Sequence, residues 1–100
     1  MQVDIKSPAD VEALLIKLIR EGSPENPEDV VEPQTIPNRD VKGFDSLTAL
    51  EVLTELEEET GIHVEEDIFY VDVTPKKYRS IRETALAIWN EIQKGGKSYA

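Results

Sequence analysis

The sequence predicts an all-α bundle of three main helices and one short helix, with a long loop after the first helix. Apolar stripes at helical spacing occur in residues 8–20 and again after residue 80. A third run, residues 46–60, contains neither Gly nor Pro. Four of the six prolines fall in residues 23–42, which excludes a regular helix or a central strand there. An up-down helical bundle fits these observations.

The first helix is expected over about residues 8–20. Ser7 is an N-cap candidate, Pro8 suits the first helical position, and Asp10 places a carboxylate in the first turn. Gly22 lies where a left-handed C-terminal cap is expected. The residues expected to be buried follow the spacing i, i+3, i+4, i+7, i+8: Val11, Leu14, Leu15, Leu18 and Ile19.

The following segment, residues 23–42, is expected to be a long loop. Loops of this length in a small domain are uncommon and usually functional. Apolar residues within and just after it are expected to pin it to the core: Val30, Val31, Ile36, Val41 and Phe44.

The C-terminal half carries clear helix boundaries. Asp45 is expected to cap a helix over residues 46–60, which Gly61 ends. Thr74-Pro75 predicts a short helix that reaches about Tyr78. Ser80 and Glu83 have the spacing of a capping box, which opens the last helix. Its expected buried stripe consists of Ile81, Ala85, Ile88, Trp89 and Ile92.

Composition excludes several classes of function. The 100 residues contain 11 Lys and Arg against 21 Asp and Glu, a net charge of −10, and no Cys. One domain is expected over residues 1–100, with its core in about 8–93 and a flexible tail in 94–100. Without Cys there is no disulfide, thiol nucleophile or Cys-based metal site, and a cytoplasmic location is expected. No membrane segment is expected, nucleic acid is disfavoured by charge, and a monomer is favoured.

The helix over residues 46–60 has two apolar faces. One face, which a three-helix core needs, contains Ala49, Val52, Leu53 and Leu56. Leu47, Leu50 and Thr54 lie roughly opposite. Because Glu51, Glu57 and Glu58 flank this second strip, it is typical of a docking surface.

Acidic residues are concentrated in the same region. Residues 45–75 contain ten Asp or Glu and no Lys or Arg. A helix that only needed solubility would usually mix the two signs and gain i,i+4 ion pairs. A partner with a basic surface is therefore indicated.

The segment Gly43-Phe44-Asp45-Ser46-Leu47, with the acidic helix that follows, resembles the attachment motif and second helix of the acyl carrier proteins. The resemblance continues through Gly61-Ile62-His63-Val64, Asp67-Ile68-Phe69 and residues 80–85, and covers most of residues 8–93. It implies a carrier that catalyses nothing itself. Ser46 would hold a 4′-phosphopantetheine arm, derived from coenzyme A and installed by a phosphopantetheinyl transferase (holo-acyl-carrier synthase), whose thiol carries acyl groups as thioesters.

The resemblance also implies roles for other positions. Partner enzymes of acyl transfer and condensation, with basic docking surfaces, would bind at Asp45, Leu47, Leu50, Glu51, Thr54, Glu57 and Glu58. Candidate positions lining the acyl chain are Phe44, Leu53 and Ile68. No catalytic or metal-binding residue is expected, since Ser46 lacks a nucleophile elbow and the only His, His63, lies beyond the far end of the same helix.

The pathway and the cargo stay open at this point. Thr48, Leu50 and Thr54 depart from the pattern of common fatty-acid carriers, and residues 65–79 form a longer and more aromatic segment. Fatty-acid, polyketide and related lipid synthesis are compatible with the sequence. The alternatives are an aminoacyl or peptidyl carrier, and an unmodified acidic helical adaptor that binds a basic partner.

Overall fold

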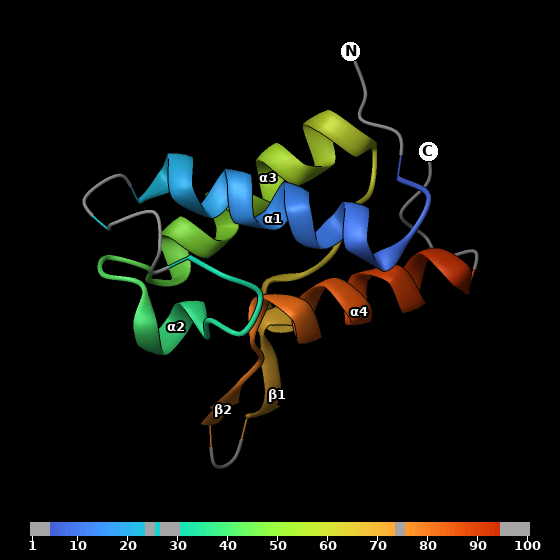
Figure 1. Cartoon of the computed structure of the whole chain (residues 1–100). Helices are drawn as coiled ribbons and strands as arrows, with labels where there is room; N and C mark the ends of the chain where they lie inside the picture. The colour runs from blue at the N-terminus through green and yellow to red at the C-terminus, as the bar shows by residue number, and fades with distance from the viewer. Residues whose placement is uncertain (1–4, 24–25, 27–30, 74–75, 95–100) are drawn as a thin grey trace.

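The computed structural model describes residues 5–23, 26, 31–73 and 76–94, and the elements form a mostly helical bundle (Figure 1). The main helices are α1 (Pro8–Gly22), α3 (Ser46–Thr60) and α4 (Ile81–Gln93), and α2 (Pro37–Asp40) is short. A 3-10 turn, η2 (Glu66–Phe69), leads into a small hairpin of β1 (Tyr70–Val73) and β2 (Lys76–Tyr78). α1 packs against both α3 and α4, while the hairpin projects away from the three main helices (Figure 1). The all-α, carrier-like fold class is thus confirmed.

α1 begins as expected and ends later than expected. The side chain of Ser7 accepts a hydrogen bond from the N–H of Asp10 at 3.4 Å. The five residues of the expected apolar stripe are all buried. The expected left-handed cap at Gly22 is wrong, because Gly22 is the last helical residue and Ser23 leaves the helix with φ −138°. α1 is therefore two residues longer than predicted, because it includes Glu21 and Gly22.

α3 has the expected boundaries. The carboxylate of Asp45 accepts a hydrogen bond from the N–H of Thr48 at 2.9 Å, which satisfies one of the unpaired donors of the first turn. At the other end Gly61 adopts φ 77°, a left-handed conformation that glycine takes without a steric penalty. The face formed by Ala49, Val52, Leu53 and Leu56 is buried.

The short helix expected between Thr74 and about Tyr78 is wrong. Residues 76–78 form strand β2, and Thr74 and Pro75 lie outside the described residues. Tyr78 pairs with Tyr70 across the hairpin, and their ring centroids are 5.1 Å apart. The N–H of Arg79 donates to the carbonyl of Phe69 at 2.7 Å, which closes the base of the hairpin. Cross-strand pairing therefore overrides the local helix signal, and the short helix of the bundle is α2 instead.

The core lies between the three main helices and η2. Phe69 is fully buried, and its ring meets that of Phe44 edge to face at 5.3 Å. Val31 and Val41 are buried, which pins the long loop as expected, and Ile36 is half-buried. Val30 lies outside the described residues, as do residues 95–100 of the expected tail.

α4 completes the bundle. Ser80 and Glu83 form the expected capping box, with both side-chain to backbone hydrogen bonds present. Ile81, Ala85 and Ile88 are buried, while Trp89 and Ile92 pack half-buried against the core. No helix in the described part of the chain is long and apolar enough to cross a membrane.

Candidate functional site

The turn before α3 buries one residue and exposes the two that follow it. Gly43 has φ 81°, so it adopts a conformation that a side chain would strain. The N–H of Asp45 donates to the carbonyl of Gly43 at 3.1 Å, and the Thr48 hydroxyl donates to the same carbonyl at 3.1 Å. Phe44 is buried, whereas Asp45 and Ser46 are exposed. The turn thus anchors one aromatic ring in the core and presents the next two residues to solvent.

Ser46 is the first residue of α3, and its hydroxyl is not used to cap the helix. Asp45 occupies the N-cap position and supplies the capping carboxylate. Among the residues that the structure describes, the Ser46 side chain has no hydrogen-bond partner. The helix N-terminus presents backbone N–H groups and the positive end of the helix dipole, which favours a negatively charged group there. The hydroxyl is therefore available for esterification by a phosphate.

The surroundings of Ser46 do not activate it as a nucleophile. The hydrogen bond from the Thr48 N–H holds the pKa of the Asp45 carboxyl below its usual range, so this carboxylate is a weak base. His63 lies beyond the opposite end of α3, a helix of 15 residues that spans about 21 Å at ~1.5 Å per residue. No serine–histidine pair can form between them.

The residues expected to bind partners lie on the outside of α3. Leu47 is 64% exposed and Leu50 52% exposed, and their i,i+3 spacing places these two large apolar side chains next to each other on the helix surface. The Thr54 hydroxyl donates to the carbonyl of Leu50 at 2.8 Å, and Thr54 is exposed like the two leucines. The exposed acidic residues around them are Asp45, Glu51, Glu57 and Glu58.

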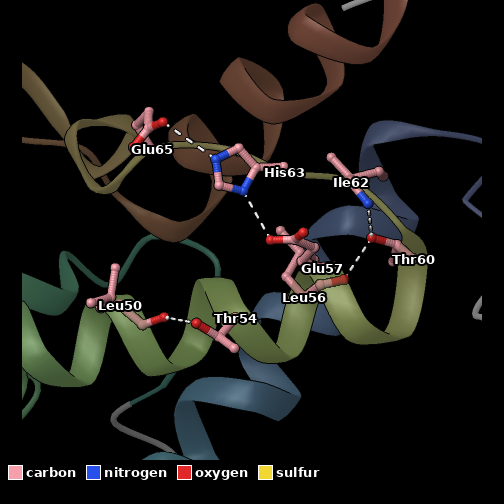
Figure 2. A network of polar contacts seen from close by, with 8 residues as sticks. All are labelled: Leu50, Thr54, Leu56, Glu57, Thr60, Ile62, His63 and Glu65. Carbon is pink, nitrogen blue, oxygen red and sulfur yellow. Dashed lines mark hydrogen bonds and ion pairs between the residues drawn. The ribbon is translucent and has the colours of Figure 1, made fainter. Parts of the chain in front are cut away.

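His63 joins this acidic surface at the carboxyl end of α3. Its Nδ1 lies 2.9 Å from Oε1 of Glu57, and its Nε2 lies 3.3 Å from Oε1 of Glu65 (Figure 2). The Glu57 contact, followed by that with Glu65, raises the pKa of the His63 imidazole. The sequence alone gave no role to this histidine, whose two partners lie six residues before it and two residues after it.

The candidate acyl-chain positions occupy the core rather than an open surface. Phe44 and Leu53 are buried, and Ile68 packs half-buried against the same cluster. Leu53 lies in α3 and Ile68 in η2, and these two elements contact each other. The three residues belong to or pack against one hydrophobic cluster, in which η2 contacts α3 and the ring of Phe44 meets that of Phe69.

One residue that the sequence did not single out holds the loop before the site. The side-chain amide of Asn26 donates to the carbonyl of Lys42 at 2.9 Å and accepts from the N–H of Lys42 at 2.8 Å. This paired contact spans sixteen residues and fixes the chain directly before Gly43. An Asn in a proline-rich loop gives no sequence signal of such a long-range bond. For metals, no group of three or more His, Asp or Glu in the described ranges is placed to hold an ion.

Comparison with known proteins gives one match. The family model described as the phosphopantetheine attachment site matches residues 40–85, which contain the turn, α3, η2, the hairpin and the start of α4. No curated protein and no solved structure matches the chain.

The helical fold and this match are consistent with a carrier protein family. Residues 40–85 match a domain that is the site of covalent 4′-phosphopantetheine attachment. Such domains are typically carriers rather than catalysts, and they work with a transferase and with partner enzymes. An exposed serine at the start of α3, inside the matched segment, fits a group joined through a phosphodiester.

Proposed function

We propose that Ser46 is the residue to which the 4′-phosphopantetheine arm is attached. The observation that carries this proposal is the exposed Ser46 hydroxyl, which takes no hydrogen-bond partner among the described residues because Asp45 caps α3. Ser7, which opens α1, and Ser80, which opens α4, both use their side chains as caps. Ser46 is thus set apart from these two helix-start serines by its uncommitted side chain.

The chain's own residues would hold the arm and present it. When bound, the arm supplies a thiol that carries its cargo as a thioester. The N-terminus of α3 stabilises the negative charge of the phosphodiester, and the Gly43 turn keeps the attachment point outside the core. The turn is held from both sides, by Phe44 in the core and by Asn26 on the loop. A long flexible arm that delivers its cargo to several enzymes requires a fixed point of attachment.

We further propose that the cargo is an acyl group and that the protein serves fatty-acid, polyketide or related lipid synthesis. The acid-rich surface of α3 supports an acyl carrier over an aminoacyl or peptidyl carrier. Phe44, Leu53 and Ile68 would line the acyl chain, which could enter between α3 and η2. The arm's thiol needs a reducing setting, which supports a cytoplasmic location.

The docking face in this proposal is the set of exposed residues on and before α3: Asp45, Leu47, Leu50, Glu51, Thr54, Glu57 and Glu58. Its carboxylates attract enzymes with basic surfaces, and charge complementarity of this kind speeds encounter more than it strengthens the final complex. Leu47 and Leu50 would supply the apolar contact at the centre of the face.

Intact-protein mass tests the attachment. The chain is incubated with coenzyme A, Mg²⁺ and a broad-specificity phosphopantetheinyl transferase, and we expect a single arm-sized increase in mass. Ser46→Ala should show no increase, while Ser7→Ala, which removes another helix-start serine, should be loaded like the unchanged chain. An increase in Ser46→Ala would place the arm elsewhere. No increase in the unchanged chain with several transferases would favour the unmodified adaptor.

A further inference from the structure

A groove runs beside the docking face, between the C-terminal turns of α1 and the middle of α3. It has a volume of about 440 Å³ and takes residues from both helices. Leu18 and Val52, which are buried, form its apolar floor, and Leu50 is exposed at its edge. α1 and α3 lie side by side in this region (Figure 1). The groove therefore adds a recessed apolar region next to the exposed side of α3.

The rim of the groove is acidic. Glu21 comes from α1, while Glu51 and Glu55 come from α3, and all three are exposed. No Lys or Arg lines the groove among the described residues. Glu51 and Glu55 are spaced i,i+4 on the helix, an arrangement of like charges that destabilises a helix. Basic groups of a partner would relieve this repulsion, whereas a role in stability alone does not explain it.

We propose that α1 takes part in docking, and that this groove receives an apolar side chain flanked by Lys or Arg on the phosphopantetheinyl transferase. The inference rests on the proposed function, and it adds Glu21 and Leu18 of α1 to the docking residues. Leu50 lies four residues after Ser46, about 6 Å along the helix axis. A standard interface covers about 800 Å² of each partner, so an enzyme that holds Ser46 also covers the groove.

Two variants test separately whether the charge of the groove and its open volume matter for docking. Glu21→Lys reverses a rim charge. Gly22→Met partly fills the groove without changing charge, and it introduces no clash at the backbone, because a Cβ on Gly22 would meet side-chain methyl carbons of Thr48 and Val52 at 3.9 Å. Glu91→Lys is the matched control, since it makes the same charge reversal on α4, where Glu91 pairs with Lys94 at 3.6 Å.

The measurement is the rate of arm transfer by a broad-specificity transferase over a range of carrier concentrations, at low and high salt. We expect Glu21→Lys to raise KM by about three- to tenfold at low salt with kcat little changed, and this effect to shrink at high salt. Gly22→Met should raise KM at both salt concentrations. Glu91→Lys should stay close to the unchanged chain.

The outcomes distinguish this inference from the function on which it rests. If the unchanged chain is loaded while Glu21→Lys matches Glu91→Lys in KM and Gly22→Met has no effect, the groove is not a docking site and the proposed function stands. If the unchanged chain is not loaded at all, the proposed function fails and the inference fails with it. Circular dichroism of each variant, compared with the unchanged chain, confirms that the bundle is intact.

Discussion

His63 and Glu57 form a contact of 2.9 Å between Nδ1 and Oε1 that joins the segment after α3 back to the last turns of that helix. Glu65 approaches the other ring nitrogen at 3.3 Å, so the imidazole lies between two carboxylates (Figure 2). Glu57 belongs to the proposed docking face, and the protonation of His63 therefore affects the charge that this face presents.

The titration of His63 is the first prediction. Because Glu57 and Glu65 favour the charged imidazole, the pKa of His63 should lie above its ordinary value of about 6.5. Glu57→Gln should lower that pKa more than Glu65→Gln does, since the Glu57 contact is shorter. Proton NMR of the imidazole ring measures the pKa of His63 in the unchanged chain and in both variants. A pKa that does not change in Glu57→Gln would contradict the contact.

The stability of the fold should follow the same titration. A group whose pKa is higher in the folded than in the unfolded state stabilises the fold fully below the unfolded pKa, and this contribution is lost as pH rises through the folded pKa. Urea midpoints of the unchanged chain and of His63→Gln should therefore differ more at pH 6 than at pH 8. The same difference at both values would show that His63 gains nothing from its partners.

The turn before Ser46 depends on the backbone of Gly43. Gly43→Ala should destabilise the protein by about 1–2 kcal/mol, because φ 81° is unfavourable for any residue with a Cβ. Gly22→Ala is the matched control. Gly22 has ordinary helical geometry and room for a Cβ, so this change should be neutral or stabilising by up to about 1 kcal/mol. Urea unfolding compares the two variants, and equal effects would argue against a strained turn.

The core under the site depends on Phe69. Phe69→Ala should cost about 3–5 kcal/mol of unfolding free energy, since the side chain is fully buried and packs against Phe44. Val71→Ala, on the hairpin that follows, should stay within about 0.5 kcal/mol because Val71 is 55% exposed. Denaturant unfolding would contradict this description of the core if the two variants were equally stable.

The docking face should act through charge. Glu58→Lys should slow association with a basic partner such as the transferase, and the salt dependence of the association rate should be smaller in the variant. Glu51→Lys should act in the same direction. Stopped-flow measurement at low salt tests both. Association rates equal to that of the unchanged chain would exclude these carboxylates from the encounter.

Much of this arrangement could be predicted from local sequence. α3 begins after Asp45 and ends at Gly61 as expected, and the capping box at Ser80 forms. These signals are read correctly because each is complete within one helix turn. The division of α3 into a buried and an exposed face also follows, since it depends only on helical spacing.

Two elements of the fold were not predicted from the sequence. The hairpin replaced the short helix expected after Thr74, since the Tyr70–Tyr78 pair and the Arg79 to Phe69 hydrogen bond favour paired strands over an isolated helical turn. α2 was missed although Pro37 stands at its first position and Asp40 accepts from the N–H of Ile36 at 2.9 Å. The helix was missed because the four prolines in residues 23–42 predicted a loop without a regular helix.

The sequence by itself determined the three main helices, the acidic outer face of α3 and the position of Ser46 at a helix start, because caps, spacing and charge act over a few residues. Only the tertiary structure decided which helix lies beside which. The contact of α1 with α3 made the groove next to Leu50, and the folded loop brought Asn26 to Lys42. Such contacts have no local signature, since their free energy is gained only when distant segments pack together.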